Sequence, residues 1–570
     1  MKRGMVLLML VWALVACGRA EHGNRVVFVS SSEHHHLDPQ RMSWAHDIRT
    51  AHLLYDPLVR LDYADQSIHP ATAERWTISD DGLTYTFTLR DGAKWSSGEA
   101  VMPEDFIYAW RRALLPDLAA DYTQMFFAIR GARAFYDWRT AALAEFTRNP
   151  GDGVALWEQT KAKFDEMVGV RAVDARTLEV TLERPTAYFL SLTAFPAFVP
   201  VHRASVEAVT RVNGTTGMVE VDAEYWSKPV SNGPYVLSER VFQERVTLDV
   251  NAHYWDRANV KNEGVVQLIV PDPLTAIQKY QRGEVDFLPD IPSAGPIAAD
   301  LVKQAGTRPD VHVQHMAGTY FYNFNCLPTL PDGRSNPLAD VRVRKALSLA
   351  MDRRAVVESV TRVNQPVARS FVPPGVVAGY EPPVERGTTF DVQRAKALLA
   401  EAGYPGGAGL TGLSILYNTG NFHELIAQAV QRQWKEHLGV EVALEALPSK
   451  AFSTRLKQHE FTIARAAWFG DYPDPTTWLG KMHSDDGNND AQWRNARYDA
   501  LLAEADALPP AQAAARLAKL AEAEALMLDE EPMGLVYHYV NVYLFDPAKL
   551  KGLELNGWAR YRLEGVTVVR

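Results

Sequence analysis

The fold class is decided by residues 413–444, which read LSILYNTGNFHELIAQAVQRQWKEHLGVEVAL. The apolar run from Leu413 to Tyr417 predicts a strand. Apolar residues then recur at helical spacing from about His423 to His437, and Gly439 can end that helix. Val440 to Leu444 returns to a strand pattern. A strand, a helix and a second strand in this order indicate a βαβ unit and an α/β domain.

The alternation of strand and helix continues on both sides of that unit. Asp340 can cap a long helix through Val357, and Asp391 and Gly403 bracket another helix as N-cap and C-terminal glycine. Further elements are predicted as a strand at 265–270, a helix capped by Thr275 and ended by Gly283, a helix at 511–528 and a strand at 535–544. The second half of the chain therefore reads as α/β.

The first half mixes strand and helix patterns without a repeat. Arg25 to Ser30 predicts a first strand, and Tyr85, Phe87 and Leu89 alternate with threonines in the period-two pattern of a half-buried strand. Pro103 can open a helix, because its missing N–H needs no partner at that position. A two-lobed mixed α/β protein fits these patterns best.

Composition narrows the class of protein. At about 150 residues per domain, 570 residues suggest roughly three to four domains. Hydrophobic residues make up 47% and charged residues 22%, which excludes wholesale disorder. The net charge of −10 disfavours nucleic acid as a partner, because phosphate binding needs a surplus of Lys and Arg. The two cysteines cannot form a disulfide framework, and Cys326 is expected to be a small buried side chain.

The N-terminus has the pattern of a secretory signal. Lys2 and Arg3 precede an apolar run from Met5 to Val15, which is too short for a stable transmembrane helix. The run ends Leu-Val-Ala-Cys17, which resembles the bacterial lipobox. We therefore expect a signal peptide at 1–16 and a lipid on Cys17. The alternative is an ordinary export signal whose last cysteine is incidental.

Searches for catalytic and cofactor motifs give little. A G-x-G-x-x-G match at 407–412 follows a helix and precedes a strand, the reverse of a dinucleotide site, so we interpret it as a loop. The run His34-His35-His36 follows the first strand. Because neighbours on a strand face opposite sides, at most His34 and His36 could share a ligand set. A metal site is one interpretation of this run, and the alternative is that the three histidines are polar residues at the rim of the protein. We assign neither a metal nor a cofactor.

Six sequence blocks together resemble the extracytoplasmic solute-binding proteins of peptide ABC importers, specifically the oligopeptide-binding branch. They follow one another in family order across nearly the whole mature chain. The blocks are Trp95-Ser-Ser-Gly98, Glu104-Asp-Phe106 with Trp110-Arg111, Ser231-Asn-Gly-Pro-Tyr235, Asp340 to Leu347, Leu398 to Tyr404, and Ala464-Arg-Ala-Ala-Trp-Phe-Gly-Asp-Tyr472.

This resemblance implies a two-lobed fold of the periplasmic-binding-protein type, of the large peptide-binding class. An extra domain is inserted, and the ligand cleft lies between the lobes. The implied boundaries are residues 18–46, 200–317 and 536–570 for domain I, 47–199 for the inserted domain II, and 318–535 for domain III.

The resemblance also implies ligand-binding residues. Asp471 matches the aspartate that receives the peptide α-amino group, and a buried ammonium does need an opposite charge. Arg465 and His423 match positions that receive the peptide carboxylate, for which an arginine fork is suited. The alternatives are a turn aspartate, a surface arginine and a helix-start histidine.

Further positions carry over less directly. Trp468 and Tyr122 match residues that line the ligand channel, although either can be a plain core aromatic. Glu33 matches a cleft residue at the exit of the first strand. Asn323 stands where well-known members have a glutamate near the ligand, and Gly470 belongs to the block that contains Asp471. The side-chain pockets are therefore expected to differ from those of familiar members.

The expected function is binding without chemistry. A lipid-anchored, monomeric protein of the periplasm or cell envelope would capture short peptides and deliver them to an ABC transporter permease. Three alternatives stay open. The same fold can bind a dipeptide, murein peptide, metal chelate or haem; the protein can be an envelope chaperone; or it can be an exported hydrolase that uses Asp471 with Asp474.

Overall fold

The predicted βαβ unit is present. β15 (Leu413–Asn418) and β16 (Val442–Leu447) pair in parallel, and α13 (His423–Leu438) connects them. Gly439 ends α13 in the left-handed conformation, with φ of 70°. Trp434, on the buried side of α13, donates its indole N–H to the carbonyl of Leu347 at 2.8 Å. The sequence pattern of this segment thus predicted its strand, helix and strand in the correct order.

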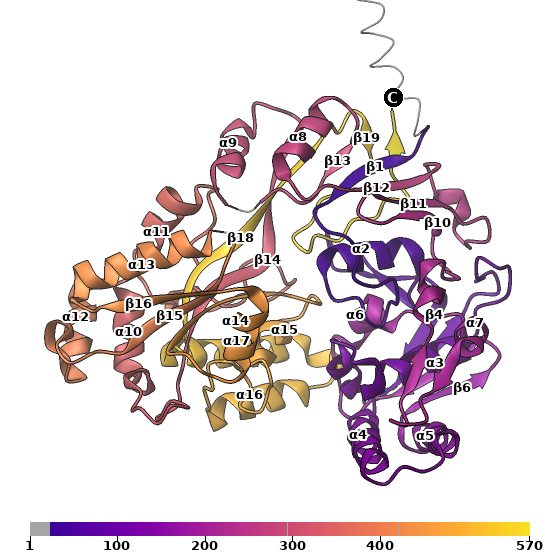
Figure 1. Ribbon diagram of the computed structural model, residues 1–570, viewed down its shortest axis with the longest axis horizontal. Coiled ribbons are helices and arrows are strands. Elements are labelled where there is room, and N and C mark those ends of the chain that lie inside the picture. The colour runs from indigo at the N-terminus through magenta and orange to yellow at the C-terminus, as the bar shows by residue number, and fades with distance from the viewer. Residues whose placement is uncertain (1–22, 293, 421, 570) are drawn as a thin grey trace, which may run out of the picture. The chain divides into compact units, whose positions relative to one another are not determined.

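The computed structural model describes residues 23–292, 294–420 and 422–569 and divides into two units of mixed α/β structure (Figure 1). Unit 1 holds the described residues through Asp290, together with Tyr543–Leu555 and the residues from Ala559 onward. Unit 2 holds Ile291–Val542 and Asn556–Trp558. The predicted fold class is confirmed. The expected signal peptide and Cys17 lie outside the described residues.

Unit 2 is built on strands that run in both directions. β17 (Ile463–Phe469) pairs antiparallel with β14 (Val311–Phe324) and parallel with β15, and β18 (Met533–Phe545) lies next to β14. The longer helices of the unit are α9 (Pro296–Gln304), α10 (Val341–Leu349), α12 (Val392–Glu401), α14 (Ser449–Lys457), α16 (Ala496–Asp506) and α17 (Ala513–Glu530). In Figure 1, α16 and α17 lie side by side.

Two larger sheets carry most of the strands of unit 1. In the first, β1 (Val26–Ser30) lies parallel to both β12 (Gly264–Ile269) and β13 (Phe287–Leu288), and β11 (Arg245–Val250) joins β12 to β10 (Tyr235–Val241). The second sheet has the order β4 (Ala73–Ile78), β5 (Thr84–Leu89), β7 (Thr177–Thr181) and β6 (Val170–Asp174). The longer helices are α2 (Ala45–Leu54), α3 (Pro103–Ala113), α4 (Ala132–Arg148), α5 (Gly153–Met167) and α8 (Pro273–Gln281). Within the described residues, no helix combines the length and apolar character that crossing a bilayer requires.

Two helix predictions are corrected by capping. α8 begins at Pro273, and the Asp272 carboxylate accepts the N–H of Thr275. The N-cap residue is therefore Asp272 and not Thr275. Asp340 does cap α10, but that helix ends at Leu349 instead of continuing to Val357. Asp352 then starts a new short helix by accepting the N–H of Ala355. A second capping aspartate therefore divides the long apolar pattern into two helices.

The prediction that His34, His35 and His36 alternate between the two faces of a strand is wrong. β1 ends at Ser30, so residues 33–36 are not in a strand and do not alternate between two faces. His34 is buried, and its ring contacts Asp47 Oδ1 at 3.1 Å and Gln267 Oε1 at 3.0 Å. His35 is instead exposed.

Candidate functional site

Arg465 lies in the centre of the unit 2 sheet, on β17. Its Nη1 donates to Asn418 Oδ1 at 3.3 Å and its Nη2 to the Tyr539 hydroxyl at 3.4 Å, while the guanidinium lies 5.1 Å from the centre of the Tyr320 ring. Its Nε is buried without a hydrogen-bond partner. Among the residues that the structure describes, no carboxylate forms an ion pair with Arg465. The cation is therefore held by neutral groups only.

His423, at the start of α13, approaches the same place. Its Nδ1 lies 3.4 Å from the Tyr320 hydroxyl, and its Nε2 is buried without a partner among the described residues. Burial, and after it the neighbouring Arg465 cation, lower the pKa of His423 to about 3. The imidazole is therefore neutral near pH 7 and can still donate or accept one further hydrogen bond.

Tyrosines from two strands complete this arrangement. The Tyr320 and Tyr537 rings stack with 4.9 Å between centroids, and the Tyr322 hydroxyl is buried without a partner in the described part of the chain. Burial by itself would lower the pKa of Arg465, but contacts with Tyr539, Tyr320 and Tyr537 leave that pKa above its ordinary value. We refer to these six residues as the arginine–tyrosine cluster: Arg465, His423, Tyr320, Tyr322, Tyr537 and Tyr539.

Sheet register divides the predicted site residues between two faces. Directly opposed residues of an antiparallel pair point the same way, and successive residues alternate. Tyr322 opposes Arg465, whereas Asn323 opposes Ala464 and Thr319 opposes Trp468. Asn323 and Trp468 therefore lie on the face away from the arginine–tyrosine cluster. Both polar atoms of the fully buried Asn323 side chain have no hydrogen-bond partner among the described residues.

Trp468 lies near the end of β17, and Asp471 lies in the loop that follows this strand. Trp468 donates its indole N–H to the carbonyl of Thr477 at 2.6 Å, and the backbone N–H of Asp471 donates to Thr477 Oγ1 at 3.1 Å. Asp471 itself is half-buried. Two hydrogen bonds to one threonine thus hold both residues where the strand ends.

Gly470 allows this loop to approach two tryptophans. A Cβ at this position would lie 2.5 Å from Cη2 of Trp478 and 2.7 Å from Cζ3 of Trp558. The N–H of Gly470 donates to the carbonyl of Ala317 at 2.8 Å. Gly470 therefore lets the chain pack closely against the two tryptophans. Asp471 follows directly after the hydrogen bond from Gly470 to Ala317.

Asp474, proposed as the partner carboxylate of a hydrolase, is already engaged. Arg516 donates from Nη1 to Oδ2 at 2.6 Å and from Nη2 to Oδ1 at 3.0 Å, in a buried two-pronged ion pair. Thr476 adds a backbone and a hydroxyl hydrogen bond to Oδ1. Such a carboxylate fixes the loop and is poorly placed to move a proton.

Glu33 and Tyr122 belong to unit 1. Glu33 accepts hydrogen bonds from Arg240 Nη2 at 2.9 Å and from the N–H of Gln243 at 2.7 Å. Burial raises the pKa of Glu33, but these hydrogen bonds and that of the His34 N–H leave it below its ordinary value. Tyr122 packs edge-on against Phe195, with 4.8 Å between ring centroids. Both side chains thus have structural contacts within unit 1.

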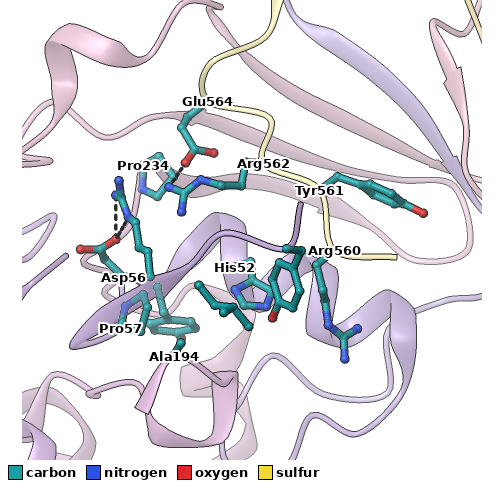
Figure 2. Close-up of a pocket in the computed structure, with 13 residues that line it drawn as sticks. His52, Asp56, Pro57, Ala194, Pro234, Arg560, Tyr561, Arg562 and Glu564 are labelled. Atoms are coloured by element: carbon teal, nitrogen blue, oxygen red, sulfur yellow. Dashed lines mark hydrogen bonds and ion pairs between the residues drawn. The ribbon is translucent and has the colours of Figure 1, made fainter. Parts of the chain in front are cut away.

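A pocket in unit 1 is too small for a peptide. It encloses about 40 Å³, which suits a few water molecules. Figure 2 shows His52 facing this space and the ion pair between Arg562 and Glu564. A second ion pair joins Arg60 to Asp56. A larger groove of about 570 Å³ lies along α13 in unit 2, lined by Phe422, Leu425 and Arg432 among others.

Sequence reasoning missed four members of the arginine–tyrosine cluster. Tyr320 with Tyr322, and Tyr537 with Tyr539, are pairs two residues apart in otherwise apolar strands. That spacing places each pair on one face and was a usable signal. What the sequence does not provide is the order of strands that brings β18 beside β14.

Comparison with known proteins identifies relatives along nearly the whole chain. Residues 67–490 match the family model described as bacterial extracellular solute-binding proteins, family 5 middle. The chain is 33% identical to the oligopeptide-binding protein OppA of Bacillus subtilis, over 88% of this chain and 85% of that protein. It is also 33% identical to the periplasmic murein peptide-binding protein MppA of Escherichia coli, over 91% and 88%. The crystal structure of Haemophilus influenzae OppA in complex with RPPGFSPFR superposes with a TM-score of 0.74 at 26% identity, covering 96% of this chain and 100% of that one.

Proposed function

Because the chain belongs to the family 5 extracellular solute-binding proteins, as its sequence blocks predicted, we propose that it captures short peptides outside the cytoplasm for an ABC-type permease. Two relatives that cover most of its length are named for oligopeptides and for murein peptides, and a third is described in complex with a nonapeptide. These printed names support peptides as the ligand class.

The observation that carries the proposal is the state of Arg465. An arginine whose Nε–H is buried usually has a carboxylate partner, because removing the cation from water is costly. Arg465 has only neutral partners among the described residues, at the long distances of 3.3 and 3.4 Å, and its Nε–H has none. A peptide carboxylate bound here would supply the missing charge. His423 Nε2 and the Tyr322 hydroxyl, also without partners, are further groups available to that carboxylate.

At the other end of the ligand, we assign the α-amino group to Asp471. The backbone N–H of Asp471 donates to Thr477, and the ion pair of Asp474 with Arg516 holds the same loop, so the backbone that carries the carboxylate is held in place. The peptide main chain would hydrogen-bond to protein backbone, which tolerates any side chain.

The test is calorimetry with matched tripeptides. We expect a tripeptide with a free carboxylate to bind, and its C-terminal amide to bind at least tenfold more weakly, because Arg465 would lose its charged partner. Equal affinity for both peptides would remove Arg465 as the carboxylate anchor. Mass spectrometry of material that co-purifies with the protein should show peptides, and its failure to show any would argue against the ligand class.

The alternative functions that this fold could serve differ in the ligand that the protein would bind. A thermal-shift screen that compares tripeptides, dipeptides, murein peptides, metal chelates and haem separates them, since only a bound solute raises the melting temperature. A chaperone would instead protect denatured clients without requiring a free α-amino group.

The finer features of location and assembly are also proposals. We propose that Cys17 carries lipid, that the protein is attached to the cell envelope and that it acts as a monomer. Mass spectrometry of the N-terminal fragment would detect acyl chains on the cysteine, and light scattering would give the assembly state. A free N-terminus without lipid would contradict the anchor.

A further inference from the structure

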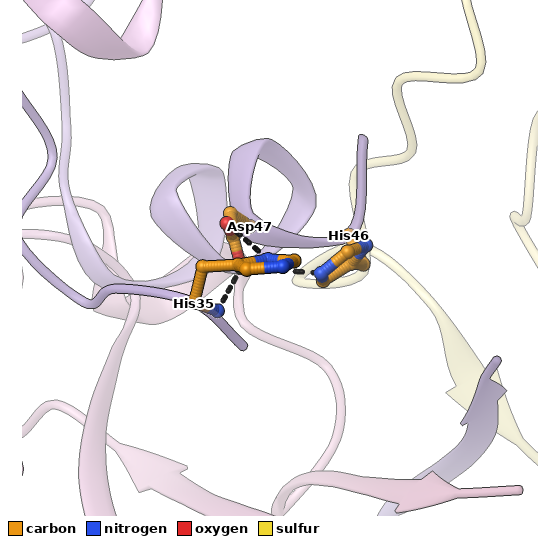
Figure 3. Close-up of side chains that lie close together, drawn as sticks. All are labelled: His35, His46 and Asp47. Atoms are coloured by element: carbon orange, nitrogen blue, oxygen red, sulfur yellow. Dashed lines mark hydrogen bonds and ion pairs between the residues drawn. The ribbon is translucent and has the colours of Figure 1, made fainter. Parts of the chain in front are cut away.

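Three side chains of unit 1 that the peptide proposal does not use converge beside the first turn of α2. His35 follows β1, and His46 and Asp47 are the second and third residues of α2 (Figure 3). One potential ligand atom from each lies within 4.8 Å of the other two. His46 and Asp47 are buried, with side-chain exposures of 9% and 0%, whereas the His35 side chain is 49% exposed.

The spacing suits coordination of one ion. His35 Nδ1 lies 3.6 Å from Asp47 Oδ2, and His46 Nε2 lies 3.5 Å from Asp47 Oδ1. With metal–ligand bonds of about 2.0–2.1 Å, neighbouring ligand atoms of a tetrahedral site are about 3.4 Å apart. Each histidine thus lies at about this distance from one oxygen of the Asp47 carboxylate, and one ligand atom from each residue lies within 4.8 Å of the other two.

Two of these groups also have unused polar atoms. Asp47 Oδ1 faces the His34 ring at 3.1 Å and accepts the N–H of His35 at 3.2 Å. Asp47 Oδ2 and His46 Nε2 have no hydrogen-bond partner in the described structure, although both are buried. Leaving a buried polar atom without a partner is unfavourable, and two such atoms beside each other point to something that binds both.

We propose that His35 Nδ1, His46 Nε2 and Asp47 Oδ2 bind one divalent transition-metal ion of the Zn²⁺ type. Imidazole and carboxylate ligands together favour Zn²⁺, Co²⁺ and Ni²⁺ over Mg²⁺ and Ca²⁺. His34 holds the other carboxylate oxygen and so orients Asp47 from outside the ligand set. Three protein ligands leave a fourth position, which the exposed side of His35 opens to water or to an added ligand.

A second cluster in the described residues lacks these features. Asp62, Asp65 and His69 also bring three ligand atoms together, but none of the three side chains is buried. Ser67 donates two hydrogen bonds to Asp65 Oδ1, and its hydroxyl lies 2.7 Å from His69 Nε2. These atoms already have partners, so this group serves as a control.

The experiment titrates the intact protein, first treated with a chelator, with ZnCl₂ by calorimetry and with CoCl₂ by visible absorption. We expect one equivalent to bind, with a cobalt spectrum of tetrahedral type. His35→Ala and His46→Ala should each weaken binding by more than about tenfold, since the loss of an outer partner alone costs 10–100-fold. Because His35 is exposed, its variant should fold normally, which circular dichroism checks.

Two variants test whether the effect is local. His36→Ala changes the neighbouring histidine of the run, and His69→Ala removes the second cluster; both should bind zinc like the unchanged protein. Absence of binding at millimolar zinc would overturn the proposal, as would unchanged affinity in His35→Ala and His46→Ala. Tripeptide affinity measured without metal tests the peptide proposal separately, so the failure of one leaves the other standing.

Discussion

At the scale of single residues, Arg465 separates a binding role from a structural one. If Arg465 serves ligand binding and does not stabilise the fold, its replacement should weaken ligand binding and leave the free energy of unfolding nearly unchanged. In Arg465→Met we expect peptide affinity to fall by about 2–5 kcal/mol, as for one partner of a buried charge pair. The free energy of unfolding should fall by no more than about 1 kcal/mol, since no carboxylate is left unpaired. Calorimetry and urea denaturation measure the two quantities.

The matched control is Arg516→Met. Arg516 pairs with buried Asp474 at 2.6 Å, so its loss leaves a buried carboxylate without its cation and should cost about 3–5 kcal/mol of stability. If Arg465→Met destabilised the fold as strongly as Arg516→Met and left affinity unchanged, Arg465 would be a structural residue.

The residues that could be predicted are those with local or motif signals. Asp471 and Arg465 were predicted as ligand-binding residues through the block that contains them, and His423 through its match to a family position. The structure brings Arg465 and His423 together. The four tyrosines of the arginine–tyrosine cluster were missed because their meeting depends on which strands are neighbours. Likewise, the bond between Glu33 and Arg240 spans 207 residues, a separation that local patterns do not resolve.

At the scale of elements, the exit of β17 depends on Gly470. Gly470→Ala would bring a methyl group to 2.5 Å of Trp478, so the loop or the indole must shift. We expect a loss of about 1–3 kcal/mol in stability and weaker peptide binding through displacement of Asp471. Gly480→Ala is the control, because a Cβ there meets no atom within 4 Å and its φ is −57°. Equal stability of the two variants would contradict this role.

The α17 helix carries a buried carboxyl that predicts a pH effect. Glu524 accepts N–H bonds from Phe371 at 2.7 Å and Val372 at 3.0 Å and the Tyr380 hydroxyl at 2.5 Å, yet burial raises its pKa to about 7. The protonated form is therefore favoured by folding, and stability falls as pH rises from about 4.5 through 7.

Glu524→Gln removes this titration while keeping an acceptor for the two N–H groups. Compared with the unchanged protein, the variant should gain roughly 2–4 kcal/mol in relative stability between pH 5 and pH 8, at about 1.4 kcal/mol per unit of pKa shift. Urea denaturation at the two pH values measures the difference. If the two proteins differed in free energy of unfolding by the same amount at pH 5 and at pH 8, the pKa of Glu524 in the fold would not be raised.

Helix and strand patterns were predicted well at this scale because they are local. The errors arose from competing caps: Asp352 divides the helix expected from Asp340 to Val357, and Asp272 replaces Thr275 as a cap. An apolar stripe records which face is buried, but it continues unchanged across a break between two helices on the same face.

For the molecule as a whole, buried histidines predict sensitivity to acid. Burial lowers the pKa of both His423 and His538 to about 3, with Arg465 and His315 adding to the effect respectively. Each stays neutral in the fold but takes up a proton near pH 6.5 when unfolded. Stability is therefore present above pH 6.5 and is lost as pH falls below it, at about 1.4 kcal/mol per pH unit and histidine.

Glu524 changes stability with pH in the opposite direction to the histidines. The clearest measurement therefore compares how steeply the free energy of unfolding changes with pH in a histidine variant and in the unchanged protein. Between pH 6.5 and 5, His538→Gln should lose less stability than the unchanged protein, by about 2 kcal/mol. Chemical denaturation across this range checks it, and parallel slopes for the two proteins would show that His538 is protonated in the fold.

The central claim is that the carboxylate of Asp471 binds the α-amino group of a peptide. The most direct test is calorimetry of one tripeptide and its N-acetylated form against the unchanged protein and Asp471→Asn. Acetylation removes the positive charge. The unchanged protein should bind the acetylated peptide more weakly by about 2–5 kcal/mol, and Asp471→Asn should bind both peptides equally weakly. An unchanged protein that binds both peptides with the same affinity, or an Asp471→Asn variant that still prefers the free amine, would contradict the claim.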